Sequence, residues 1–175
     1  VSQVDVDPCL DSFAITPVAD RAADEAFTVA VEAKNATGQT ITTYNESLSV
    51  DLSPVPSVGT NAIPSTVVFS EGEVSFSGNI QDAGDYTLTI TDQGPNPDVS
   101  VSTSFSVAAG PANQVTILEG NNQTITVGQA ASPLVVAVQD AVGNNIAGQT
   151  VTFDAGGDGS LSETTATTGN DGKAS

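Results

Sequence analysis

Apolar and polar side chains alternate through Phe27-Thr28-Val29-Ala30-Val31-Glu32-Ala33-Lys34. Because successive side chains of a β-strand point to opposite faces, this spacing places four apolar side chains on one face of an extended segment. The same two-residue period returns at 48–52, 86–90, 99–107, 115–117, 125–127 and 151–153, between turn signals such as Glu71-Gly72 and Asp171-Gly172. These patterns predict an all-β chain folded as a sandwich of antiparallel strands. The alanine-rich stretch 19–26 is expected to form a helical turn.

The composition excludes several classes of function. The chain has 21 acidic and three basic residues, a net charge of −18, no histidine and a single cysteine. This charge repels phosphate groups, so we expect no nucleic-acid partner and no anionic membrane surface. Catalytic triads, Cys–His dyads and zinc sites built from His or Cys are excluded by composition. The longest apolar run, 134–138, is far shorter than a membrane span, so we expect no membrane insertion.

The strand pattern is interrupted by small residues and a proline at 109–112. We therefore expect an N-terminal extended segment at 1–10, a first sandwich at 11–108, a short linker at 109–112 and a second sandwich at 113–175. A linker this short predicts a stiff connection. The segments 29–38 and 135–144 are similar to each other, which indicates an internal repeat of roughly 105 residues, the size of one sandwich.

Two segments of the second half follow each other in a recognisable order. Residues 138–153 contain a strand, a D-x-x-G-N turn and a G-x-x-V-x-F strand, and residues 167–174 contain T-x-x-x-D-G-x-A. This order resembles the bacterial immunoglobulin-like domains of the invasin/intimin type. The resemblance implies tandem immunoglobulin-like β-sandwiches, an extracellular location at the cell surface, and structural or adhesive work without catalysis or a cofactor.

The first half contains a second motif, Asp82-Ala83-Gly84-Asp85-Tyr86-Thr87-Leu88. It resembles the D-x-G-x-Y tyrosine corner of immunoglobulin sandwiches. The resemblance implies structural roles for Asp82, Gly84, Tyr86 and Leu88. Tyr86 would donate a hydrogen bond to the backbone across the corner, and Leu88 would stand where antibody domains carry a cysteine.

The second sandwich is expected to lack its last strands, because an immunoglobulin-like sandwich needs about 100 residues and the sequence stops at Ser175. One explanation is that the chain, which opens on Val1, is a processed piece of a long repeat array. The other is that residues 1–8, with Val1, Val4 and Val6 on the donor strand, complete the second sandwich of the next subunit. Such a head-to-tail contact generates a fibre. Cys9 would then be an intermolecular link, and is otherwise a free thiol.

Other residue patterns each have two interpretations. Asp154, Asp158 and Asp171 lie in acidic turns that offer oxygen ligands for calcium, or they serve the turns themselves. Asn35, Asn45 and Asn122 begin N-x-S/T acceptors for glycosylation, which also arise by chance in an Asn- and Thr-rich chain. Lys34 is either a solvated lysine or a partner in a Lys–Asn isopeptide bond. Pairs of carboxylates such as Asp82 and Asp85 are expected to be solvated rather than catalytic.

We therefore expect a non-enzymatic module of a microbial surface stalk or fibre, with protein partners: further copies of itself, head-to-tail, or neighbouring repeats. The ligand of such a stalk is not specified by the sequence. The first alternative is a self-assembling filament subunit. Others are an accessory carbohydrate-binding module of a secreted enzyme and a decoration domain of a phage particle. The excess of carboxylates also predicts stability that increases with salt.

Overall fold

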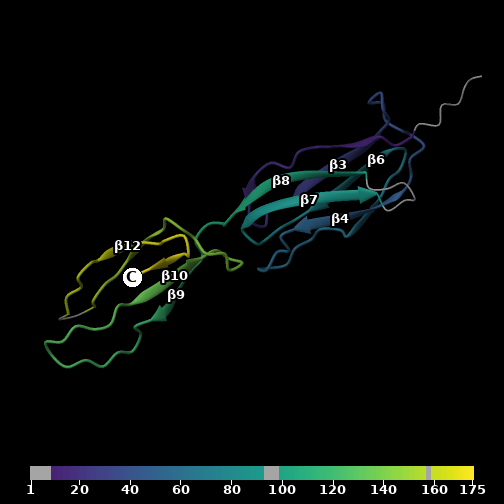
Figure 1. Ribbon diagram of the computed structural model, residues 1–175. Coiled ribbons are helices and arrows are strands. Elements are labelled where there is room, and N and C mark those ends of the chain that lie inside the picture. Colours follow the sequence, from purple (N-terminus) through teal and green to yellow (C-terminus); the bar gives the residue numbers. More distant parts are fainter. Residues whose placement is uncertain (1–8, 93–98, 157–158) are drawn as a thin grey trace, which may run out of the picture. The chain divides into compact units, whose positions relative to one another are not determined.

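The computed structural model describes residues 9–92, 99–156 and 159–175. Within these ranges the chain forms thirteen β-strands and no helix, so the predicted all-β class is confirmed (Figure 1). No segment in these ranges therefore qualifies as a membrane-spanning helix. The chain divides between Ala108 and Ala109 into two compact units, called unit 1 and unit 2 below.

Unit 1 is a sandwich of two sheets. The first sheet has the order β1-β3-β6 and is antiparallel, with β1 at Ser12–Ile15, β3 at Phe27–Lys34 and β6 at Glu73–Gly78. The second sheet has the order β2-β8-β7-β4-β5. Its strands are β2 (Arg21–Ala22), β4 (Ser47–Ser53), β5 (Thr66–Val68), β7 (Gly84–Asp92) and β8 (Ser100–Ala108). The sandwich architecture predicted from the alternation is present in unit 1, whereas its immunoglobulin type remains a prediction.

The core of unit 1 follows from the two-residue period. In β3, Val29, Val31 and Ala33 are at most 1% exposed, while the side chains between them reach toward solvent. They pack in one cluster with Leu88 and Phe105 of the opposite sheet. Full burial of each large apolar side chain contributes about 1.5–3 kcal/mol, which is why the period fixes which face of each strand turns inward.

The segment 19–26 contains a strand instead of the predicted helical turn. β2 pairs in parallel with β8, through Arg21 opposite Val107. The Arg21 guanidinium donates hydrogen bonds to the carbonyls of Ala19 and Ala26 and lies 4.5 Å from the ring centroid of Phe27. The prediction of a helical turn is wrong: the pairing with β8 holds Arg21–Ala22 extended, and the chain then makes one tight turn, in which the N–H of Glu25 donates to Ala22 O at 3.2 Å and Asp24 has a φ of 68°.

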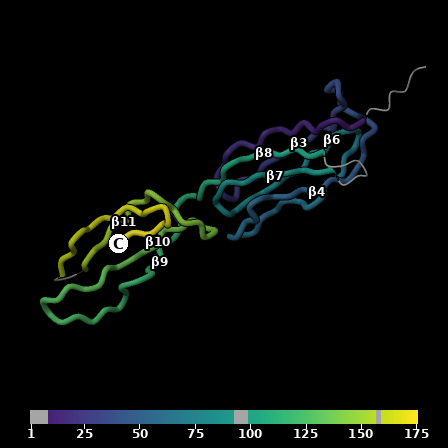
Figure 2. The backbone as a smooth tube through the Cα atoms, in the orientation of Figure 1, coloured from purple at the N-terminus to yellow at the C-terminus, as the bar shows by residue number. Residues whose placement is uncertain are grey.

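Unit 2 contains a three-stranded antiparallel sheet and a separate strand pair (Figure 2). The sheet has the order β13-β10-β9, with β9 at Gln114–Glu119, β10 at Val135–Gln139 and β13 at Lys173–Ala174. The pair consists of β11 (Thr150–Thr152) and β12 (Thr165–Thr167). The strand predicted at 125–127 is absent: Ile125 and Val127 are 52% and 100% exposed. Alternation without a partner strand or a covering layer does not hold a segment extended.

The two units repeat the same backbone hydrogen bonds about one sandwich length apart. The N–H of Ala33 donates to Gly72 O, and the N–H of Val138 donates to Gly172 O, both at 2.9 Å. Ile41 likewise donates to Ala33 O, and Ile146 to Val138 O. Thus β1, β3 and β6 correspond to β9, β10 and β13, in the same sheet order.

The strand pairs also match. In β4 and β5, Ser47 pairs with Val68, and the N–H of Phe69 donates to Glu46 O. In β11 and β12, Thr150 pairs with Thr167, and the N–H of Thr168 donates to Gln149 O. Hence β11 and β12 correspond to β4 and β5. The internal similarity seen in the sequence reappears as a shared strand plan.

Candidate functional site

The tyrosine corner motif lies at the start of β7. The Tyr86 hydroxyl donates a 3.0 Å hydrogen bond to the carbonyl of Asp82, four residues earlier, and Tyr86 is 3% exposed. Burial, followed by the nearby Asp82 charge, raises the pKa of Tyr86 to about 12. Gly84 begins β7 and pairs with Val107, while Leu88 is fully buried in the core. These positions hold the turn before β7 against the body of unit 1.

The Asp82 carboxylate connects this corner to a distant loop. It accepts hydrogen bonds from the N–H and hydroxyl of Ser57 and from the N–H of Val58. Burial opposes ionisation, but the hydrogen bonds from Ser57 and Val58 outweigh it and lower the pKa of Asp82. Asp82 is therefore an ionised acceptor that fixes the loop after β4.

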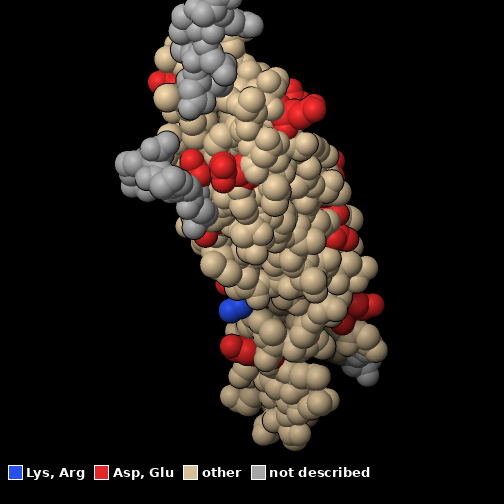
Figure 3. All heavy atoms as spheres, turned by 90° about the vertical axis from the view of Figure 1, so that its right-hand side faces the viewer, with Lys and Arg blue, Asp and Glu red and all other residues tan. Residues whose placement is uncertain are grey.

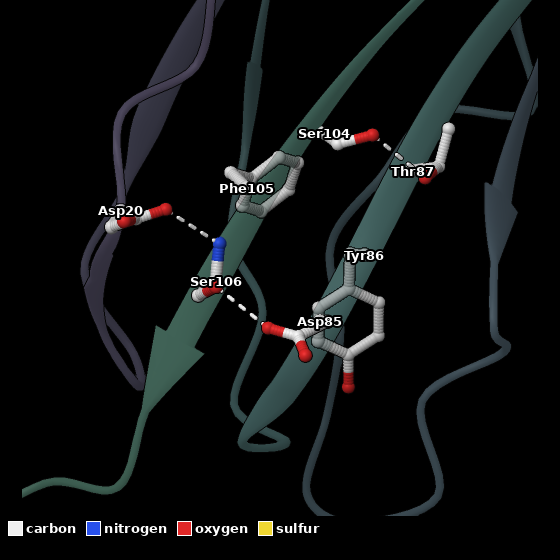
Figure 4. Close-up of a pocket in the computed structure, with 7 residues that line it drawn as sticks. All are labelled: Asp20, Asp85, Tyr86, Thr87, Ser104, Phe105 and Ser106. Carbon is white, nitrogen blue, oxygen red and sulfur yellow. Dashed lines mark hydrogen bonds between the residues drawn. The ribbon is translucent and has the colours of Figure 1, made fainter.

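A shallow hollow of about 380 Å³ lies on the β7–β8 face near the corner (Figure 4). Asp20 accepts a 2.7 Å hydrogen bond from the N–H of Ser106, and Asp85 accepts a 2.6 Å bond from the Ser106 hydroxyl. The two carboxylates thus bind the same serine on β8. Asp82, by contrast, bonds to Ser57, so Asp82 and Asp85 do not share a partner. The arrangement connects segments of the sandwich, because both carboxylates are hydrogen-bonded to Ser106.

Asp140 forms a buried anchor in unit 2 and is 3% exposed. Its Oδ1 accepts hydrogen bonds from the N–H groups of Val142, Gly143 and Asn144, at 2.9–3.0 Å. Its Oδ2 accepts from Asn144 Nδ2 at 2.8 Å and from the N–H of Gly110 at 2.9 Å. Burial opposes ionisation, but the Asn144 side chain and the backbone donors outweigh it and lower the pKa of Asp140. The D-x-x-G-N motif contained this residue, but the sequence did not indicate the bond to Gly110.

Two of the calcium candidates make ordinary turn contacts. Asp154 accepts a hydrogen bond from the N–H of Gly156 at 3.0 Å. Asp171 accepts from the N–H of Lys173 at 3.2 Å, and its Oδ2 lies 3.8 Å from the Lys173 ammonium. Asp158 lies outside the described residues. Among the residues that the structure describes, no three His, Cys, Asp or Glu side chains gather as a metal site.

The candidate modification sites differ in exposure. Asn45 and Asn122 are exposed, whereas Asn35 is half-buried and its Oδ1 accepts hydrogen bonds from the N–H groups of Thr37 and Gln39. Cys9 is exposed. The donor-strand residues Val1, Val4 and Val6 lie outside the described residues. Glycosylation and the Cys9 link therefore remain proposals.

Lys34, the isopeptide candidate, is held in an ion pair. Its ammonium group contacts the Glu32 carboxylate and donates to the Thr40 hydroxyl at 2.9 Å. The hydrogen bond from Lys34, with a second from Thr40, lowers the pKa of Glu32. An isopeptide bond requires an asparagine carboxamide beside the lysine, whereas the Lys34 ammonium contacts a carboxylate and a hydroxyl.

Most of the exposed large apolar side chains among the described residues lie in unit 2, while Val55 and Val68 of unit 1 are also exposed. Every residue of β9 is exposed. Val115 is 59% and Ile117 is 48% exposed, although their cross-strand partners Val138 and Val136 are buried. Further exposed apolar residues of unit 2 are Leu118, Ile125, Val127, Leu134 and Leu161. Large exposed apolar surface marks a site of protein contact. We call Val115 and Ile117 the β9 face and take it as the candidate interaction site.

Acidic side chains are scattered over the face of the molecule seen in Figure 3, with little basic surface among them. In the part of the chain that the structure describes, two ion pairs are present, Lys34–Glu32 and Lys173–Asp171. Most carboxylates therefore face solvent without a cationic partner.

Comparisons with known proteins found no matching family model and no similar curated protein. Solved structures of the S-layer protein SbsC are similar in part. Its domains 4 and 5 match at 19% identity over 58% of this chain, with a TM-score of 0.38. Domains 5–6 match at 19% identity over 95% of this chain and 82% of that chain, with a TM-score of 0.39. The chain spans about half the length of the domain 4 and 5 structure (54%).

Proposed function

We propose that the chain is an extracellular, non-catalytic module of a microbial surface stalk or fibre. Its function in this proposal is structural, as a spacer within the stalk, and adhesive. The carrying observation is the repetition of one strand plan in tandem, with the bond from Ala33 to Gly72 matched by the bond from Val138 to Gly172. Tandem copies of one module are typical of proteins that extend by adding repeats. Partners of such a module are proteins: neighbouring repeats or further copies of the chain.

The connection between the units supports this proposal. The carbonyl of Ala108 still accepts a hydrogen bond from Ala23 of unit 1, and the N–H of Gly110 already donates to Asp140 of unit 2. Ala109 alone stands between these two bonded residues. The linker is thus short, as in tandem modules joined without a long flexible spacer.

The surface chemistry supports an extracellular, soluble module. Exposed carboxylates keep a protein hydrated and oppose non-specific aggregation. The carbohydrate-binding alternative gains no comparable support, since the large apolar side chains that are most exposed among the described residues are aliphatic. Stacking on sugars requires aromatic rings.

The test is immunogold labelling of intact source cells with an antibody against the chain. We expect label on the outer surface, and loss of that label after brief protease treatment of unbroken cells. A cytoplasmic enzyme of the same cells is the control and should survive the treatment. Label confined to the cell interior would overturn the proposal.

The filament alternative is favoured by one specific observation, the exposed β9 face on an edge strand. In that proposal residues 1–8, through Val1, Val4 and Val6, add a strand to the second unit of the next subunit, and the exposed Cys9 lies near the junction. Deletion of residues 1–8 should abolish filaments in negative-stain micrographs. Cys9→Ser should leave filaments intact, because the chain has one cysteine and a head-to-tail junction therefore brings a single thiol to unit 2. Filaments formed by the deletion variant would contradict this alternative.

A further inference from the structure

The chain enters and leaves unit 1 along two segments that run in the same direction. After β1, the chain leaves the first sheet and lies along β8 of the second sheet. The N–H of Val18 donates to the Thr103 hydroxyl at 3.3 Å, and Arg21 pairs in parallel with Val107. Residues 18–23, called the entry segment below, therefore follow residues 103–108 of β8 in parallel.

This arrangement places the start of β1 and the end of β8 at opposite ends of unit 1 (Figure 1). β1 starts beside the end of β3, where the N–H of Asp11 donates to Lys34 O, and β8 ends at Ala108 beside Ala23. Tension along the chain pulls these two points in opposite directions. Since hydrogen bonds between strands lie across the strand direction, such a pull shears many of them at once. A pull on neighbouring strands from the same end breaks the bonds one after another.

Hydrogen bonds on either side of β2 reinforce its attachment to β8. β2 itself has two residues, which provide few backbone bonds. The Asp20 carboxylate adds a 2.7 Å hydrogen bond from the N–H of Ser106, and the N–H of Ala23 donates to Ala108 O at 2.8 Å. The entry segment is therefore bonded to β8 beyond both ends of β2.

Arg21 ties the entry segment to both sheets. It is the one arginine of the sequence. Its guanidinium lies 4.5 Å from the ring centroid of Phe27 in β3 and 5.9 Å from that of Phe105 in β8. It also donates to the carbonyls of Ala19 and Ala26, at 2.8 Å and 3.3 Å. The rings attract the cation, and the two carbonyl bonds fix the backbone before and after β2.

We propose that the entry segment and β8 form a shear clamp, through which unit 1 resists tension applied along the chain, and that Arg21 holds this clamp closed. The inference rests on the proposed function, since a stalk or fibre transmits tension from module to module. A segment that only covered the edge of β8 would stabilise unit 1 equally for every direction of pull. A clamp resists one direction in particular.

The first experiment is single-molecule force spectroscopy of the full chain with two pairs of attachment points. In the lengthwise pair, the exposed Cys9 and Ala109→Cys place the handles at opposite ends of unit 1. In the same-end pair, Ala26→Cys and Ala109→Cys are combined with Cys9→Ser. The lengthwise pair should need about twice the unfolding force of the same-end pair, because its bonds are sheared together. Equal unfolding forces would overturn the proposal.

The second experiment changes the clamp and keeps the lengthwise handles. Arg21→Met retains an unbranched apolar chain without the guanidinium, so the unfolding rate at a fixed force should rise about tenfold. Asp20→Ala, at an exposed position, removes the bond to Ser106 and should raise the rate about threefold. Tyr86→Phe is the matched control, because it removes a hydrogen bond at the corner before β7 and none within the clamp.

Urea unfolding of the three variants separates mechanical from thermodynamic effects. We expect Tyr86→Phe to lose stability in urea while its unfolding rate under lengthwise load stays close to that of wild type. Rates of Arg21→Met and Asp20→Ala that equal the wild-type rate under lengthwise load would overturn the proposal. An equal effect of Arg21→Met on the same-end pair would also overturn it. Immunogold labelling is independent of these forces, so the clamp and the proposed surface function fail separately.

Discussion

The carboxylate of Asp140 accepts a hydrogen bond from the backbone of Gly110, 30 residues earlier, at 2.9 Å. The residue at the matching position of unit 1 is Asn35, whose Oδ1 also accepts hydrogen bonds from backbone N–H groups of its turn. A carboxylate has a second acceptor oxygen, and in Asp140 this oxygen holds the linker. Asn35 of unit 1 thus bonds to N–H groups of its own turn. Asp140 of unit 2 bonds in addition to the backbone at the start of the unit, at Gly110.

Replacement of Asp140 by alanine should destabilise unit 2 by about 2–4 kcal/mol, because several buried donors lose a charged acceptor. Asp140→Asn keeps the shape and should cost less. Urea unfolding monitored in unit 2 measures the change. Asp154→Ala, on an exposed turn, is the control and should cost less than about 0.5 kcal/mol. Equal stabilities of the Asp140→Ala and Asp154→Ala variants would contradict the anchoring role.

The lowered pKa of Asp140 also predicts a pH dependence. A carboxyl with a folded-state pKa below its unfolded-state pKa contributes stability that is complete above the unfolded value of about 4. That contribution is lost as the pH falls through the lower folded value. The difference in unfolding free energy between wild type and Asp140→Asn should therefore shrink on acidification below about pH 4.

Gly172 sits where a side chain has no room. Its φ is +70°, and an added Cβ would lie 2.8 Å from Asn145 Cβ and 3.1 Å from both Ile146 N and Val138 O. Gly148 has a similar φ of +73° with nothing within 4 Å of such a Cβ. We expect Gly148→Ala to cost about 1–2 kcal/mol from the backbone conformation alone. Gly172→Ala should cost at least about 1 kcal/mol more, from overpacking, in thermal or urea unfolding. Similar costs for both variants would show that the close approach is relieved by small movements.

Tyr86→Phe removes the bond to the Asp82 carbonyl and leaves the buried ring in place. The loss should be about 1 kcal/mol of unfolding free energy, since one neutral hydrogen bond is removed and an acceptor is left with fewer donors. Because the pKa of Tyr86 is raised to about 12, its contribution is complete below pH 10 and declines as the pH rises toward 12. Wild type should therefore lose stability over this range more steeply than Tyr86→Phe. Parallel pH curves would contradict this assignment.

The strands were predictable where an alternating segment pairs with a neighbouring strand and its apolar face packs against a second layer of the fold. β3, β4, β7 and β8 meet both conditions, so their two-residue period appears directly as alternating burial. The stretch around Ile125 has the same alternation but neither a partner nor a cover, and it is not a strand. Local pattern identifies which side chains would share a face, whereas pairing depends on distant residues.

The candidate sites were less predictable, for the same reason. The bond from Tyr86 spans four residues and belongs to a local motif. The bond between Asp140 and Gly110 and the contact of Asp82 with Ser57 join residues 25–30 positions apart. Sequence spacing alone does not determine such distances. Likewise, the exposure of Val115 became visible only by comparison with Phe13 at the matching position of unit 1.

Calcium should have no effect on thermal stability. Asp154 and Asp171 direct carboxylate oxygens at backbone N–H groups of their own turns, whereas calcium requires six or more converging oxygens. We expect the same melting temperature in excess EDTA and in millimolar CaCl₂. Asp171→Asn is a second check and should not change the response to calcium. A rise in melting temperature with calcium that Asp171→Asn or Asp158→Asn removes would establish a site at these turns.

Salt should stabilise the chain, because the 21 acidic residues, offset by only three basic residues, repel one another in the compact state. Screening shortens from about 10 Å at 0.1 M salt to about 3 Å at 1 M, so the melting temperature should rise by about 5 °C between low salt and 1 M NaCl. NaCl is the appropriate salt, since sulfate also strengthens apolar burial. A variant with Asp51→Asn, Glu73→Gln, Glu119→Gln and Glu163→Gln neutralises four exposed carboxylates. It should melt higher at low salt and respond less steeply to NaCl. A flat response of the wild-type chain up to 1 M would show that its carboxylates are too well solvated to oppose folding.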